Sequence, residues 1–196
     1  SSGVQTTAAK NKPPEGTVVR ADSQSAGRGQ FGSRWESAAG KNLTLSVILY
    51  PTWLEVQAQF YLSMATALSL RDAVHGTRYT VHGARHTVHD MRDDENPSAV
   101  YRVPCTVCRV PCTVKWPNDL YLAARKAAGI LIQNAVSGQH LQTSVVGIGL
   151  NVNQMEFDPA LPNPTSLALF FGKNFDLDEL AERLFECLER RYLQLK

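Results

Sequence analysis

Twelve residues near the start of the chain, 24–35, combine backbone freedom with positive charge. They contain three glycines and two arginines, together with Gln24 and Trp35. Glycines let the backbone approach a ligand closely because no Cβ stands in the way. Successive exposed N–H groups in such a loop form an anion-binding concavity, to which Arg28 and Arg34 add forked donors. The segment therefore predicts a loop that wraps an anionic or amide-rich small molecule, although a solvated glycine-rich turn has the same composition.

Two further segments carry polar residues that a fold alone does not require. The first is 115–119, whose Pro-Asn-Asp sequence also suits an ordinary turn. It is followed by Lys126, which could be one more solvated lysine. The second is 147–153, where glycines permit close backbone approach and Asn151 could simply close a strand. Taken separately, none of these segments identifies an activity.

The bulk composition is that of an ordinary globular protein. Of the 196 residues, 43% are hydrophobic and 19% are charged, which is enough to form one domain with a sizeable core. The net charge of +2 gives no reason to expect a nucleic-acid or membrane partner. No run of about 18 apolar residues could span a bilayer, and no secretion signal is visible. We therefore expect a cytoplasmic protein.

Hydrophobic periodicity predicts an α+β fold with a mixed, mostly antiparallel sheet and helices packed on it. A short buried strand at 17–21 leads into the glycine loop, and residues 43–50 alternate as a second strand does. A long, largely buried helix is predicted at 55–74. The remaining predicted elements are strands at 113–115, 120–122, 129–133 and 144–151, a charged turn at 123–128, a short helix at 165–171 that stops at Gly172, and a final helix capped by Asp176 with Cys187 as a packing residue.

Residues 75–112 separate the long helix from the next strand and contain two tandem repeats with a period of seven residues. Neither repeat places apolar residues where a coiled coil needs them, so duplication of short segments explains them better than a structural array. We expect a flexible, solvent-exposed insertion. The alternative interpretation is a zinc site, because the repeats supply histidines and cysteines (His82, His86, His89, Cys105, Cys108 and Cys112).

In combination, the motifs resemble the biotin–protein ligase family and occur in that family's order. They are Gln-Ser-Ala-Gly-Arg-Gly at 24–29, Arg-Trp at 34–35, Gly-Lys-Asn-Leu at 40–43, Lys-Trp-Pro-Asn-Asp at 115–119, Arg-Lys-Ala-Ala-Gly-Ile-Leu at 125–131 and Gly-Ile-Gly-Leu-Asn at 147–151. The resemblance covers most of the chain outside 75–112. It implies the biotin–lipoate ligase catalytic domain, a fold similar to that of class II aminoacyl-tRNA synthetases.

The resemblance implies a two-step, ATP-dependent ligase. The biotin carboxylate would attack the α-phosphorus of ATP to give biotinyl-5′-AMP and pyrophosphate, with Mg²⁺ bridging phosphate oxygens. A lysine of a biotin carboxyl carrier domain would then attack the adenylate to give an amide and AMP. No side-chain metal ligands are predicted. Biotin, ATP and the carrier domain are the expected partners, no nucleic acid or membrane is expected, and homodimer formation stays open.

Residue roles are carried over from the resemblance motif by motif. The implied catalytic residues are Lys126, Arg28 and Asp119, with Lys126 contacting both the biotin carboxylate and the α-phosphate. The implied biotin-binding residues are Ser1, Ser2, Gln24, Gly27, Arg28, Gly29, Gln30, Lys126, Gly129 and Gly147. The implied ATP- or adenylate-binding residues are Arg28, Trp35, Lys115, Asn118, Lys126 and Asn151. Gln30 stands where the family usually has a second arginine.

We expect residues 1–196 to form one catalytic domain that is incomplete at both ends. The strand that the family places before its Ser-Thr-Asn motif is missing, and so is the small β-barrel that often follows the catalytic domain. Two alternatives stay open beside an active ligase. One is a truncated or insertion-damaged remnant that binds biotin without turnover. The other is a relative that transfers lipoate or octanoate.

Overall fold

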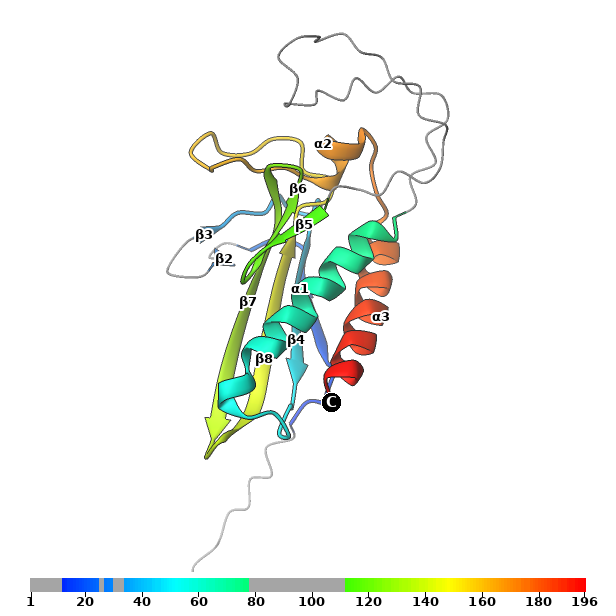
Figure 1. Ribbon diagram of the computed structural model, residues 1–196. Coiled ribbons are helices and arrows are strands. Elements are labelled where there is room, and N and C mark those ends of the chain that lie inside the picture. Colours follow the sequence, from blue (N-terminus) through cyan, green and yellow to red (C-terminus); the bar gives the residue numbers. More distant parts are fainter. Residues whose placement is uncertain (1–11, 25–26, 30–33, 78–111) are drawn as a thin grey trace, which may run out of the picture.

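A computed structural model of the protein describes residues 12–24, 27–29, 34–77 and 112–196 (Figure 1). Its main element is a six-stranded sheet with the strand order β1-β4-β8-β7-β6-β5. A separate pair of two-residue strands, β2 and β3, forms a second, smaller sheet. The strands are β1 (Val18–Ala21), β2 (Gly27–Arg28), β3 (Arg34–Trp35), β4 (Leu43–Leu49), β5 (Cys112–Lys115), β6 (Asp119–Leu122), β7 (Arg125–Ser137) and β8 (His140–Leu150).

Two long helices, α1 (Phe60–His75) and α3 (Leu177–Leu195), pack against each other and cover one face of the six-stranded sheet (Figure 1). A 3-10 helix, Val56–Ala58, precedes α1, and the short α2 (Leu167–Phe171) lies between β8 and α3. All pairs between the described strands are antiparallel. The predicted α+β class is therefore confirmed. No helix in the described parts of the chain is long and apolar enough to cross a membrane.

The core lies between the sheet and the two long helices. Alternate residues of β4, from Leu43 to Leu49, are buried, as the period of a half-covered strand requires. Their cross-strand partners on β8, among them Ile148 and Leu150, belong to the same buried cluster as Leu62 of α1 and residues of α3. The residues between them point to the opposite face of the sheet, which we call the open face.

Three predictions about individual elements are wrong in detail. The strand predicted as buried at 17–21 is an edge strand, and its Val18 and Val19 are 37% and 57% exposed. The long helix, predicted to be largely buried, begins at Phe60 rather than at residue 55, and its Phe60 and Met64 are exposed. Its buried residues instead include Leu62, Ala65 and Leu70, because neighbours in three dimensions select the face when apolar residues surround a helix.

The third error concerns the charged turn predicted at 123–128. The turn contains only residues 123 and 124, with Ala123 in the left-handed region at φ 52°. Residues 125–128 already belong to β7, which is 13 residues long and much longer than the predicted strand 129–133. Lys126 is therefore fixed in a sheet rather than carried on a surface turn.

The predicted end signals of α2 and α3 are confirmed. Gly172 terminates α2 with a left-handed φ of 68°, and its N–H bonds the Ala168 carbonyl. Asp176 caps α3 by accepting from the N–H groups of Asp178 and Glu179. Cys187, the predicted packing residue, is buried in the core.

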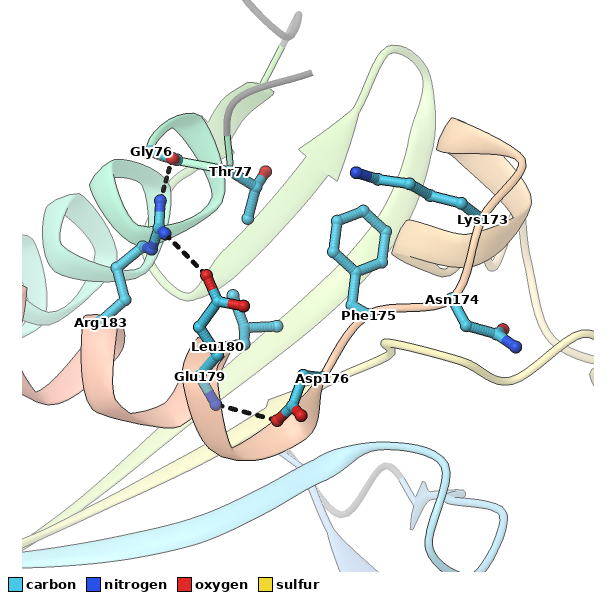
Figure 2. Close-up of a pocket in the computed structure, with 9 residues that line it drawn as sticks. All are labelled: Gly76, Thr77, Lys173, Asn174, Phe175, Asp176, Glu179, Leu180 and Arg183. Carbon is cyan, nitrogen blue, oxygen red and sulfur yellow. Dashed lines mark hydrogen bonds and ion pairs between the residues drawn. The ribbon is translucent and has the colours of Figure 1, made fainter. Parts of the chain in front are cut away.

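Hydrogen bonds of Arg183 join the end of α1 to the start of α3 (Figure 2). Arg183 donates to the Gly76 carbonyl and, at 3.3 Å, to the Glu179 carboxylate. These residues line a cavity of about 320 Å³.

The two end residues of the insertion predicted at 75–112 lie in regular structure. His75 is the last residue of α1, and Cys112 is the first residue of β5. Residues 78–111 lie outside the described residues, as do the histidines and the first two cysteines of the zinc hypothesis.

A half-buried charge cluster joins the C-terminal parts of the two long helices. Asp72 of α1 accepts from Arg191 of α3 at 2.6 and 3.1 Å and from Arg71 at 3.0 Å. Arg190 adds an ion pair at 3.7 Å. Burial alone would raise the pKa of Asp72, but the hydrogen bonds and charges of Arg191 and Arg71 outweigh it and lower the pKa below its ordinary value of 3.8.

We expect Asp72→Asn to lower the free energy of unfolding by about 1–3 kcal/mol at neutral pH, as the loss of charged hydrogen bonds does. A carboxylate whose pKa is lowered by folding stabilises the fold above the ordinary pKa. That contribution disappears as the pH falls through the lowered pKa. Urea unfolding should therefore show a gap between the variant and the parent protein above pH 3.8 that closes below it.

The matched control is Glu179→Gln, which removes an exposed i,i+4 partner of Arg183. Such pairs contribute only about 0.3–0.5 kcal/mol. An equal loss of stability in both variants would contradict the role assigned to Asp72.

Candidate functional site

Lys126 lies in β7, and an irregularity in the pairing of β7 with β6 decides which face of the sheet it occupies. The register shifts between Leu120 and Tyr121, which leaves Ala127 as an extra, fully buried residue on β7. Strict alternation counted from Gly129 would direct Lys126 toward the helices. The bulge returns it to the open face, where its Cε lies 3.7 Å from the position of a Cβ on Gly129.

The Lys126 ammonium forms an ion pair with Asp119 on β6. Nζ and Oδ1 are 2.8 Å apart, and the side chains are 34% and 16% exposed. Oδ1 accepts no hydrogen bond from the described residues, so the contact is an ion pair and not a directed hydrogen bond. Lys115 pairs with Asp119 across β5 and β6, and its ammonium lies 5.5 Å from the centre of the Tyr121 ring. Two cations and one carboxylate therefore gather on the open face.

A segment far along the chain fixes the backbone of Lys126. The N–H of Lys126 donates to the Asn163 carbonyl at 2.8 Å, and the N–H of Thr165 donates back to the Lys126 carbonyl at 2.8 Å. Between them, Pro164 forms an isolated parallel bridge with Lys126. Both backbone groups of Lys126 on this edge are thus satisfied, which restricts the direction of its side chain.

Asn151 connects this segment to the end of β8. Its N–H donates to the Ala127 carbonyl at 2.8 Å, and its Nδ2 donates to the Thr165 carbonyl at 3.0 Å. The residue is 5% exposed, yet its Oδ1 has no hydrogen-bond partner among the described residues. An unpaired buried acceptor is costly, so this oxygen is suited to accept from a ligand N–H or O–H.

Glycines leave bare backbone in the middle of the open face, and Trp35 covers it. Gly129 and Gly149 are direct cross-strand partners on β7 and β8. A Cβ on Gly149 would lie 2.5 Å from Cζ2 of Trp35 and 2.8 Å from its Nε1, so only glycine permits this approach. Nε1 is buried without a partner among the described residues. The indole therefore lies in close contact with a floor of peptide groups, and its Nε1 donor has no partner among the described residues.

The glycine loop reaches this floor through the small sheet. Gly27 pairs with Trp35 in the β2–β3 ladder, and Gln24 Oε1 lies 3.0 Å from the position of a Cβ on Gly27. Arg28 pairs with Arg34 through the backbone, but their side chains lie outside the described residues, as do Ser1, Ser2 and Gln30. The structure therefore places Gly27 against Trp35, with the Gln24 side chain beside Gly27, and does not describe the side chains of the two loop arginines. Gly29, next in the chain after β2, is partly buried.

Other predicted site residues are less central. Asn118 contributes its backbone, because its carbonyl accepts from the N–H of Ile130 at 2.8 Å. Gly147 continues the glycine floor, and a Cβ there would lie 3.1 Å from the Leu131 carbonyl oxygen. Sequence reasoning missed Gly149 as a floor residue, although its spacing of two from Gly147 puts both on one face of a strand. It also missed residues 163–165, for which the sequence gives no signal.

No group of three or more His, Cys, Asp or Glu side chains that could hold a metal occurs in the described part of the chain. Cys112 is the one cysteine of the zinc hypothesis that is described, and it is buried without a disulfide partner. Burial raises the pKa of its thiol to about 12. Cys112 belongs to the buried hydrophobic cluster, so its side chain contributes to the packing of the core.

Comparison with known proteins gives a consistent result. The profile of the family described as the Biotin/lipoate A/B protein ligase family matches residues 4–151. The bifunctional ligase/repressor BirA of Bacillus spizizenii is 28% identical over 187 residues, which cover 94% of this chain and 48% of that protein. The biotin–[acetyl-CoA-carboxylase] ligase of Mycobacterium tuberculosis is 30% identical over 187 residues, covering 95% and 58%.

A solved structure of the biotin protein ligase from Aquifex aeolicus in complex with biotin and ATP has a similar fold. The TM-score is 0.68 at 26% identity, and the match covers 95% of this chain and 65% of that one. The chain thus spans about half the length of the curated relatives it matches, with shares of 48% and 58%.

The contact between Trp35 and the glycine floor leads to a testable expectation. In a Trp53→Phe, Trp116→Phe background, Trp35 is the only indole that emits. Gly149→Ala should then shift the emission to longer wavelength, because the new methyl group forces the indole off the floor into water.

Gly129→Ala is the matched control on the neighbouring strand. Its Cβ would lie 3.4 Å from Trp35, close to ordinary contact, so a much smaller shift is expected. Equal emission from both variants would show that Trp35 does not occupy the floor in solution.

Proposed function

Because the chain belongs to the biotin/lipoate A/B protein ligase family, we propose that it activates biotin with ATP and transfers it to a lysine of a carrier protein. The observation that carries the proposal is the combination on one open face of the Lys126–Asp119 ion pair and a glycine floor covered by Trp35. The names of the relatives support biotin as the acid and ATP as the co-substrate.

In the first step, a carboxylate oxygen of biotin bonds to the α-phosphorus of ATP, and the bond from that phosphorus to the bridging oxygen of pyrophosphate breaks. Negative charge is concentrated on the carboxylate and the α-phosphate during this exchange. Lys126 is held in place by Asp119 before any ligand binds, so its ammonium stabilises that charge with little rearrangement. Lys115 adds a second cation on the same face.

Because Trp35 already lies in contact with Gly149, a thin ring system would be held beside the indole, with the neighbouring backbone at Gly129 and Gly147 as its floor and Trp35 as a side wall. The unpaired Nε1 of Trp35 and the unpaired Oδ1 of Asn151 offer a donor and an acceptor to the ligands. Asn151 adjoins Ala127, next to Lys126, so its oxygen suits the exocyclic amine of an adenine whose phosphate contacts Lys126. Gln24 and the backbone of 27–29 would close over the acid.

In the second step, the amine of the acceptor lysine bonds to the acyl carbon of biotinyl-5′-AMP, and the bond from that carbon to the phosphate oxygen breaks. The products are an amide and AMP, and the amine loses a proton. Asp119 lies beside Lys126 at the reacting end of the site, which suits it to orient the incoming amine. Lys126 remains beside the leaving phosphate and stabilises its charge.

Magnesium would be held at this site mainly by the nucleotide, with a smaller contribution from the protein. The carboxylate beside Lys126 is that of Asp119, and Mg²⁺ bound to nucleotides is usually held by one or two carboxylates together with phosphate oxygens and water. When bound, the ion would neutralise charge on the departing pyrophosphate. Asp119 is the described residue placed to share in holding it.

Lys126→Ala should reduce biotin-dependent pyrophosphate release by about 100-fold or more, because it removes a preorganised charge from the transition state. The measurement combines the protein with ATP, Mg²⁺, biotin and a carrier domain, and follows pyrophosphate and biotinylated carrier in parallel. Lys196→Ala, at the end of α3, is the matched lysine control and should keep full activity. A folded parent protein that forms no adenylate would refute the proposal.

The same assay distinguishes the alternative functions. We expect biotin to be used in preference to lipoate and octanoate when the three acids compete at equal concentration, since the relatives are biotin ligases. Preferred transfer of lipoate or octanoate would assign the chain to the other activities of its family. Biotin affinity in calorimetry without pyrophosphate release would identify a binding protein that has lost turnover.

A further inference from the structure

We propose that Gln154 and Asn42 are positioning residues that hold Trp35 over the glycine floor and thereby set how tightly the site retains biotin and its adenylate. The two side chains lie outside the site itself and touch none of its charged groups in the contacts described above. The inference about their catalytic effect rests on the proposed function. The inference about the position of Trp35 does not.

The two amides form a buried network between the end of β8 and the loop 36–42. Asn42 and Gln154 are 3% and 5% exposed. Asn42 Nδ2 donates to Gln154 Oε1 at 2.5 Å, and Asn42 Oδ1 accepts from the N–H of Val152 at 2.9 Å. The Asn153 N–H donates to the Lys41 carbonyl at 2.7 Å in the same region. Buried amides with satisfied partners fix one arrangement of the segments that they join.

The network ends two and three residues after Trp35, at Ser37 and Ala38. Gln154 Oε1 also accepts from the N–H of Ala38 at 3.0 Å, and Asn42 Nδ2 donates to Ser37 Oγ at 3.1 Å. Trp35 is itself the last residue of β3, and the β2–β3 ladder has two residue pairs among the described residues. Such a short ladder gives little restraint of its own. The position of the indole therefore depends on the anchor at Ala38.

Residues 151–154, which follow β8, also hold the lysine side of the site. Asn151 donates to the Thr165 carbonyl, and Thr165 and its neighbour Asn163 fix the backbone of Lys126. Asn151 thus positions the lysine side, whereas Gln154 positions the tryptophan side. Asn151 and Gln154 both belong to residues 151–154. The distance between Lys126 and Trp35 therefore depends on one short segment of backbone.

The test uses Gln154→Met, which keeps the size of the side chain and removes both polar atoms. In the Trp53→Phe, Trp116→Phe background, we expect the Trp35 emission to move to longer wavelength. The KM for biotin should rise about tenfold, the equivalent of one lost buried hydrogen bond. The kcat at saturating biotin should stay within about twofold, and free biotinyl-5′-AMP should escape from the enzyme.

Two variants separate positioning from general stability. Asn153→Ala removes two hydrogen bonds from the same segment, but these bonds hold Phe175 at 2.8 and 2.9 Å and not the loop beside Trp35. It should lower the melting temperature without changing the emission of Trp35 or the KM. Gln154→Glu keeps the accepting oxygen for Ala38 and should lie nearer to the parent protein than Gln154→Met in both readouts.

Each result has a defined meaning. Unchanged Trp35 emission in folded Gln154→Met would overturn the positioning role, and shifted emission with an unchanged KM would overturn its link to ligand retention. If the parent protein releases no pyrophosphate, the proposed function fails, while the emission measurements still decide whether Gln154 positions Trp35. If Gln154→Met does not fold, Ser37→Ala removes one contact of the same network without burying a charge and should shift the emission of Trp35 in the same direction by a smaller amount.

Discussion

The single extra residue in β7 is the constraint on which the arrangement of the site depends. In a regular strand, side chains alternate between faces, so Lys126 would share the face of the core with Ala128. A lysine on that face would bury its ammonium among leucines, at a large cost in free energy. The bulge at Ala127 changes the alternation once and places Lys126 beside Asp119. Ala127 itself faces the core, where its small side chain fits the crowded side of the bulge.

A second constraint comes from polar side chains that follow β8. Asn151, Asn153 and Gln154 each bind the backbone of a different segment, near Thr165, Phe175 and Ala38 respectively. A residue that satisfies backbone groups in this way replaces the ladder hydrogen bonds that an irregular loop lacks. The loops around the site are thus ordered by one region of the chain, although they lie far apart in sequence.

Much of the fold was predictable because its signals are local. The alternation in β4, the Asp176 cap and the Gly172 stop each depend on a few neighbouring residues, and the structure confirms them. The bulge was not predictable, since Lys126 looks like a turn residue until its pairing with β6 is known. Val18 is exposed because β1 lies at the edge of the sheet, and the strand order is not visible in the local sequence either.

In the candidate site too, local features were predictable and long-range contacts were not. Its residue types and their grouping were visible in the motifs, and Lys126, Asp119, Gly129 and Trp35 do lie together. The contacts that hold them do not show in the sequence, because a buried amide such as Gln154 resembles any loop glutamine. Their partners are more than 100 residues away along the chain, and the sequence has no pattern that joins such distances.

The glycine floor restricts how this site could change during evolution. A wall made of side chains can be reshaped by substitution in either direction, toward larger or smaller groups. A floor of peptide backbone offers no such freedom, because every replacement of Gly149 adds atoms where Trp35 already lies. Adaptation to a different ligand would therefore have to occur in the covering loop and at the charged end, and the floor would be inherited unchanged.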